Sequence, residues 1–208
     1  MTPTMIIPLP LLLIVAAACN FGCSSGNISA SSSLANLRGS GGAMQLESRT
    51  ELMRTILNRE GSKLNLKDLR EVHFDPAESE IRVWVGFGIF VPRCFVLRRV
   101  NDQYQAHLVT IQDSSVKMSP LAAPQSGWTA FEQLLKDHKI NPPIELKPDD
   151  EHFADPDEEV IAVEAKSGER YALVYYPVNT QTEDGKNVVN LCKTIEKDFA
   201  IRMGCEPH

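Results

Sequence analysis

Residues 81–87 read IRVWVGF and place an apolar side chain at every second position. A period of two is typical of a β-strand with one face turned toward a core. The same alternation recurs in five further segments, at residues 72–74, 95–97, 104–111, 160–165 and 171–176. Residue types that favour turns lie between several of these segments, at residues 75–78, 101–103 and 166–169. We therefore expect antiparallel strands, with a meander as the simplest topology and a hairpin formed by the last two.

Three other segments have apolar residues at spacings of three and four, as amphipathic helices do. The first begins near Leu46, and Gly61 is expected to end it. The second follows Ser126, a plausible helix cap, after a loop at residues 118–125. The third covers residues 184–199. One face of the second helix carries most of its large side chains, namely Trp128, Phe131, Leu135 and His138.

Strands interspersed with segregated helices indicate an α+β fold. We expect a single domain over residues 46–208, built as an antiparallel sheet of about five to seven strands with three helices packed on it. A domain of this size can bury roughly 70% of the surface of its unfolded chain. The sequence therefore has enough residues for one substantial core.

The composition describes a globular, acidic protein. Of the 208 residues, 43% are hydrophobic and 23% are charged, and the formal net charge is −6. Lys and Arg are scattered among Asp and Glu, so no segment builds the basic face that phosphate binding requires. Nucleic acid is therefore not an expected partner.

The amino-terminal segment has the features of an export signal. Residues 5–18 are uncharged and mostly apolar, and Arg38 is the first charged residue of the sequence. Fourteen residues are too few to span a bilayer as a helix but match the apolar core of a secretory signal. We expect residues 1–18 to be a signal peptide and the mature protein to lie outside the cytoplasm.

The end of this segment reads Val15-Ala16-Ala17-Ala18-Cys19, which resembles the lipobox of bacterial lipoproteins. The resemblance implies that Cys19 becomes the lipidated first residue and anchors the protein in a membrane of the cell envelope. Ordinary cleavage after Ala18 is the alternative and would give a secreted, soluble protein. Residues 19–45 include a run, from Gly22 to Ala43, with seven Ser and five Gly, so we expect a flexible tether there.

Four cysteines remain after Cys19: Cys23, Cys94, Cys192 and Cys205. An exported protein meets an oxidising compartment, so these residues are candidates for disulfides. Cys23 falls in the tether, and Cys205 lies within reach of Cys192 across the end of the last helix. We expect one bridge, between Cys192 and Cys205, with a buried free thiol at Cys192 as the alternative.

No recognised catalytic, phosphate-binding or metal-binding motif is present, and we expect no cofactor and no metal ion. Cys94 and His107 lie on strands expected to be neighbours and could form a thiolate–imidazole pair, although an inert core cysteine is the simpler interpretation. The acidic residues between 149 and 159 lack the order of a calcium-binding loop and are interpreted as a solvated connection.

The folded part resembles small exported bacterial proteins of no named family. The resemblance depends on Gly127-Trp128, Glu164, Tyr171, Tyr175-Tyr176-Pro177 and Cys192. It implies no activity. We expect an extracytoplasmic, lipid-anchored, non-enzymatic interaction or structural module, with the membrane and another envelope protein as partners. An inhibitor or immunity-type protein that binds a cationic envelope-targeting enzyme is the first alternative, and a hydrolase is the second.

Overall fold

The computed structural model of the chain describes residues 46–86, 91–142, 144–147 and 159–205, which all belong to one compact unit. The signal segment, Cys19 and the tether lie outside these residues. The described residues form an α+β fold with one six-stranded antiparallel sheet and three α-helices, as the sequence predicts. The strands are β1 (Ser79–Val85), β2 (Arg93–Val100), β3 (Gln103–Gln112), β4 (Ser115–Pro120), β5 (Val160–Ser167) and β6 (Arg170–Pro177). The helices are α2 (Leu46–Lys63), α3 (Trp128–Asp137) and α4 (Glu183–Asp198).

The strand order is β4-β3-β2-β1-β5-β6. Strands β1 to β4 form the expected meander, but the β5–β6 hairpin joins the free edge of β1 instead of continuing beyond β4. The turns after β2 and β3 each place two residues at positive φ, Asn101 and Asp102 in one and Asp113 and Ser114 in the other. This backbone matches the twist of a tight two-residue hairpin.

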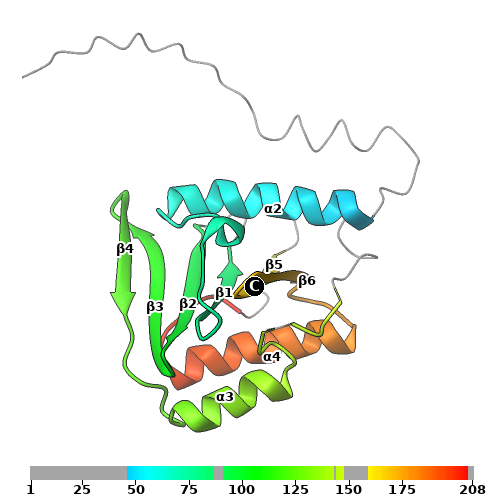
Figure 1. Cartoon of the computed structure of the whole chain (residues 1–208). Coiled ribbons are helices and arrows are strands. Elements are labelled where there is room, and N and C mark those ends of the chain that lie inside the picture. The colour runs from blue at the N-terminus through cyan, green and yellow to red at the C-terminus, as the bar shows by residue number, and fades with distance from the viewer. Residues whose placement is uncertain (1–45, 87–90, 143, 148–158, 206–208) are drawn as a thin grey trace, which may run out of the picture. The chain divides into compact units, whose positions relative to one another are not determined.

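The sheet lies between two layers of helix, with α2 on one face and α3 and α4 on the other (Figure 1). Burial on both faces explains why the central strands β1 and β5 have almost no exposed position. Under α2 the core includes Met53, Leu57, Leu64, Trp84, Cys94, Val109 and Tyr175. Under α3 and α4 it includes Val83, Phe95, Phe131, Val163, Val188 and Ile195.

Three details of the expected secondary structure were wrong. Residues 72–74 form no strand, because the chain there follows a short 3-10 helix (Leu69–Glu71) and Phe74 packs beneath Arg98 from a loop. Strand β4 replaces the first part of the expected loop at residues 118–125, and its exposed, mixed pattern gives no clear period. Gly61 does not end α2, which continues to Lys63 and passes close to the indole of Trp84 at that point.

The last helix and the tail that follows it are held by several contacts. The Thr182 side chain caps α4 by accepting a hydrogen bond from the Gly185 amide, 3.1 Å away. The tail turns back so that the Gly204 amide donates to Glu196 Oε1 at 2.8 Å and Arg93 Nη1 donates to the Met203 carbonyl at 3.0 Å. These contacts place the carboxyl end of the described chain against β2 and α4.

No helix in the described ranges combines the length and apolar character that a membrane crossing would require.

Candidate functional site

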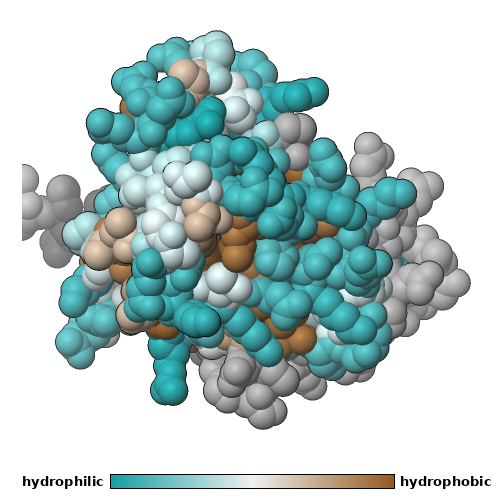
Figure 2. All heavy atoms as spheres, turned by 90° about the horizontal axis from the view of Figure 1, so that it is seen from below, coloured by the Kyte–Doolittle hydropathy of each residue, from teal (hydrophilic) through white to brown (hydrophobic). Residues whose placement is uncertain are grey.

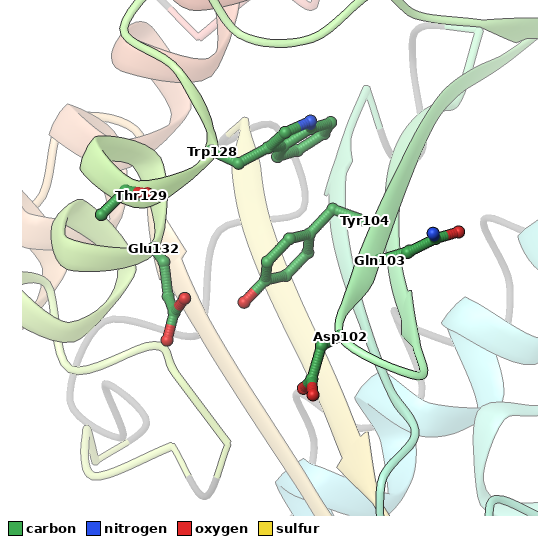
Figure 3. Close-up of a pocket in the computed structure, with 6 residues that line it drawn as sticks. All are labelled: Asp102, Gln103, Tyr104, Trp128, Thr129 and Glu132. Carbon is green, nitrogen blue, oxygen red and sulfur yellow. The ribbon is translucent and has the colours of Figure 1, made fainter.

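An open pocket lies between the β2–β3 turn and the first turns of α3. Its volume is about 470 Å³ and its lining residues are Asp102, Gln103, Tyr104, Trp128, Thr129 and Glu132. Figure 3 shows that Tyr104 and Trp128 form one side of it, while Thr129 and Glu132 project from α3 on the other. We refer to these six residues as the Tyr104–Trp128 pocket.

The backbone positions the two sides of this pocket. Asp102 occupies the second position of the tight turn, with φ 61°, so that Tyr104 follows at the start of β3. On the other side, Gly127 has φ 82° and begins α3 without a side-chain cap. Ser126, the expected cap, instead donates its hydroxyl to Asp198 Oδ2 at 2.6 Å. That bond ties the start of α3 to the end of α4.

The two rings of the pocket are stacked on each other. The centroids of Tyr104 and Trp128 lie 5.2 Å apart and the ring planes differ by 18°. Trp128 also contacts Phe131 edge-on, with centroids 6.5 Å apart, and Phe199 at 6.1 Å. Both stacked rings are half-buried. The pocket therefore has a rigid aromatic side, because its rings are continuous with the core.

Two groups of the pocket, Glu132 and Tyr104, have shifted pKa values. A hydrogen bond from Lys136, with an Nζ to Oε1 distance of 2.8 Å, lowers the pKa of Glu132. Burial, together with the charge of Glu132, raises the pKa of the Tyr104 hydroxyl. At neutral pH Glu132 is therefore a carboxylate and Tyr104 a neutral phenol. The pocket can accept hydrogen bonds and attract positive charge, but neither group is tuned to exchange a proton near pH 7.

A second polar cluster lies on the opposite face of the sheet, under α2. Glu164 is 3% exposed, and it accepts hydrogen bonds from Trp84 Nε1 at 2.8 Å and from the Tyr171 hydroxyl at 2.7 Å. Burial raises the pKa of Glu164 and that of Tyr171. Arg82 lies opposite Glu164 in the register and bonds Glu80 at 2.7 Å.

This second cluster is closed. The Arg82 guanidinium also donates to the Lys67 carbonyl at 2.7 Å, and Lys166 donates to the Arg70 carbonyl, so the loop before β1 covers the charged row. Glu80, Arg82, Glu164 and Lys166 are all at most 7% exposed. Buried charges that are paired and hydrogen-bonded in this way specify how the covering segment packs. We therefore assign this cluster a structural role.

Cys94 and His107 do not form a reactive pair. Cys94 is fully buried and faces Val109 across the β2–β3 ladder, whereas His107 faces Val96. Burial raises the pKa of Cys94 well above its usual range, so the side chain stays a neutral thiol. The hypothesis of a thiolate–imidazole pair was therefore wrong, and the interpretation as an inert core cysteine agrees with this environment.

Cys192 and Cys205 are joined by a disulfide in the structure, with their Cα atoms 5.8 Å apart. Cys19 lies outside the described residues, as does nearly all of the acidic connection between 149 and 159. Within the described ranges, no three His, Cys, Asp or Glu side chains gather closely enough to hold a metal ion.

From the sequence, Tyr104 is expected in a strand and Trp128 on one face of a helix, and neither expectation brings the two residues together. The turn at residues 101–103 was the sequence feature that could have indicated this site, because it puts Asp102 next to the ring of Tyr104 at an exposed corner. No sequence period could show that α3 packs beside that corner.

No known protein family, characterised protein or solved structure matches the chain.

Proposed function

We propose that the chain is an extracytoplasmic, lipid-anchored, non-enzymatic interaction module that binds its partner through the Tyr104–Trp128 pocket. The observation that carries this proposal is the stacked pair of rings beside the carboxylates of Asp102 and Glu132 at an open cavity. Half-exposed aromatic rings next to polar groups are common at recognition sites, since they bury large areas at little entropic cost.

The remaining surface supports the choice of this pocket. Among the described residues, the only large apolar side chains classed as exposed are Val91 and Met118. Seen from the side of α3 and α4, apolar surface forms a limited area among polar side chains (Figure 2). The described residues therefore offer no broad hydrophobic interface, which favours specific contacts at a small polar and aromatic site.

The ionisation of Glu132 and Glu164 favours binding over catalysis. General acid–base catalysis needs a group whose pKa lies near the working pH and that reaches the substrate. Glu132 has a lowered pKa, and Glu164, whose pKa is raised, is bonded to Trp84 and Tyr171 beneath α2 on the other face of the sheet.

The pocket is bordered by α3, on the other face of the sheet from α2 (Figure 1). The expected anchor at Cys19 precedes α2 in the sequence, and α2 covers the face of the sheet opposite to α3 (Figure 1). A partner at the pocket would therefore approach from the side away from the helix that continues from the tether. The anchor itself is tested by detergent phase partitioning. We expect the wild type in the detergent phase and Cys19→Ser in the aqueous phase, and equal partitioning of both variants would contradict lipidation.

The binding surface is tested by site-specific photo-crosslinking in intact cells. Gln103 and Gln112 are a matched pair, because both are exposed and they begin and end the same strand, β3. A photoreactive residue at position 103 should give a discrete adduct, and one at position 112 should not. The adduct should weaken when Asp102→Asn and Glu132→Gln are combined. Equal labelling at both positions, or none at position 103, would refute the assignment of the pocket.

A further inference from the structure

The charges that line the Tyr104–Trp128 pocket have one sign. Asp102 and Glu132 contribute carboxylates, and none of the described residues that line the cavity is basic. Two cations lie close by but outside the lining: Lys136 bonds Glu132 Oε1 at 2.8 Å, and Arg99, opposite Tyr104 in the β2–β3 register, acts electrostatically on Tyr104 and Glu132. The chain as a whole carries a formal charge of −6. The two carboxylates of the lining therefore complement a positively charged group that enters the cavity.

The aromatic side of the pocket narrows the choice of cation. The faces of tyrosine and tryptophan rings attract cations, and a planar guanidinium also stacks on them. Carboxylates bind guanidinium through two parallel hydrogen bonds, which an ammonium cannot reproduce. Tyr104 and Trp128 on one side and Glu132 on the other provide both kinds of contact within one cavity of about 470 Å³.

We propose that this pocket binds an arginine side chain presented by a basic partner protein, with the guanidinium held between the rings and the carboxylates of Asp102 and Glu132. The inference rests on the proposed function and names the chemistry of its partner. A pocket that binds arginine indicates a protein that binds a cationic target, rather than a purely structural module.

Lys136 has a defined part in this proposal. Its side chain is 48% exposed and forms an (i, i+4) ion pair with Glu132, an arrangement that is weak on a protein surface. In the free protein Lys136 therefore bonds the Glu132 carboxylate, and the incoming guanidinium displaces it. Removal of the Lys136 charge should strengthen binding of a cation and leave binding of a neutral ligand unchanged.

The test follows the indole N–H resonances of the full chain in detergent micelles by proton–nitrogen correlation spectra. Only two tryptophans are present, and Trp84 is 1% exposed with its N–H bonded to Glu164, so it serves as an internal reference. The probes are acetyl-Gly-Arg-Gly-amide, the same peptide with citrulline in place of arginine, and the trisaccharide of N-acetylglucosamine. The arginine peptide should shift the Trp128 resonance and leave that of Trp84 in place.

Three variants sharpen the result. Asp102→Asn combined with Glu132→Gln should weaken binding of the arginine peptide by about tenfold or more, the loss of one to two charge-assisted contacts. Lys136→Gln should strengthen it. Asp113→Asn is the matched control, because Asp113 also occupies a tight β-turn at positive φ, 48°, but lies at the other end of β3. This control should change nothing.

The outcomes separate the two proposals. Equal shifts with the arginine and citrulline peptides, or weaker binding by Lys136→Gln, would overturn recognition of a cation. A shift with the trisaccharide alone would overturn it too and would leave a saccharide-binding pocket. If no probe shifts Trp128 while position 103 still crosslinks specifically, the proposed function stands and the arginine inference falls. If crosslinking also fails, both are wrong.

Discussion

Replacement of Glu164 should show how strongly the buried polar cluster holds α2 and the sheet together. Glu164→Leu removes the acceptor for Trp84 Nε1 and for the Tyr171 hydroxyl while filling a similar volume. Glu164→Gln keeps one acceptor oxygen but presents an amide N–H₂ to the second donor. Glu169→Gln, on the exposed turn between β5 and β6, is the matched control.

The magnitude follows from the burial of the two donors. Trp84 is 1% exposed, so its unbonded N–H costs about 1–3 kcal/mol, whereas the half-buried Tyr171 hydroxyl loses about 0.5–1.5 kcal/mol. Arg82, opposite Glu164, also loses a neighbouring charge. We expect Glu164→Leu to lower the free energy of unfolding by about 2–5 kcal/mol and Glu164→Gln by about 1–2 kcal/mol. Glu169→Gln should stay within about 0.5 kcal/mol of the wild type.

The effect of Glu164→Gln should also depend on pH. Burial raises the pKa of Glu164 in the folded state above its unfolded value of about 4.5. A carboxyl group with a raised pKa contributes stability that is present below the unfolded pKa and is lost as pH rises through the folded pKa. Gln cannot titrate. The wild type should therefore exceed the Gln variant by more at about pH 5 than at about pH 8.

Urea unfolding, followed by tryptophan fluorescence and circular dichroism at both pH values, measures these differences. A loss below about 0.5 kcal/mol for Glu164→Leu would show that the cluster is open to water and that α2 does not cover it. A deficit of the Gln variant that grows with pH would show that the sign assigned to the pKa shift is wrong.

Three further predictions concern the rest of the fold. Cys205→Ser should lower the free energy of unfolding by about 2–4 kcal/mol, since the bridge joins two residues that are 13 positions apart. Peptide mapping without reduction should link Cys205 to Cys192, and Cys94 should be alkylated only after unfolding; free thiols at both positions would refute the bridge. Gly185→Ala should lower the free energy of unfolding by about 1–3 kcal/mol, because the new methyl group would lie 2.8 Å from Thr182 Oγ1. Gly61→Ala in α2, whose new methyl group would have neighbours at 3.4 Å or more, should leave this free energy unchanged or raise it by up to about 1 kcal/mol, and thermal melts of both variants measure the difference. A fragment that ends at Asp113 should be unfolded, because β1 loses its partner β5, and a sharp thermal transition in that fragment would show two independent folding units.

Local patterns in the sequence were sufficient for most of the secondary structure. The alternation at residues 81–87 and 104–111 identifies β1 and β3, and the spacing of apolar residues identifies α3 and α4. These predictions succeed because a strand or helix with one face in the core must repeat apolar side chains with its own geometric period. The α+β class follows from the order of the elements.

The errors lie where that reasoning lacks a signal. Strand β4 is an exposed edge strand, so its side chains show little contrast between faces. Phe74 is 2% exposed but reaches the core from a loop, so its apolar character was mistaken for a strand. Gly61 was expected to end a helix that in fact continues to Lys63 and lies beside Trp84. At Phe74, packing against a distant segment outweighed the local preference.

The candidate site depended on tertiary structure throughout. Tyr104 and Trp128 are far apart in the sequence, and they stack only because α3 returns beside the β2–β3 turn. The pairing of β1 with β5 likewise joins segments on either side of α3 and creates the buried row that contains Glu164. The sequence by itself determined most of the elements and their apolar faces, because these follow from local periodicity. Which faces meet, and hence the pocket, was decided by long-range packing, because contacts between distant residues leave no period in the chain.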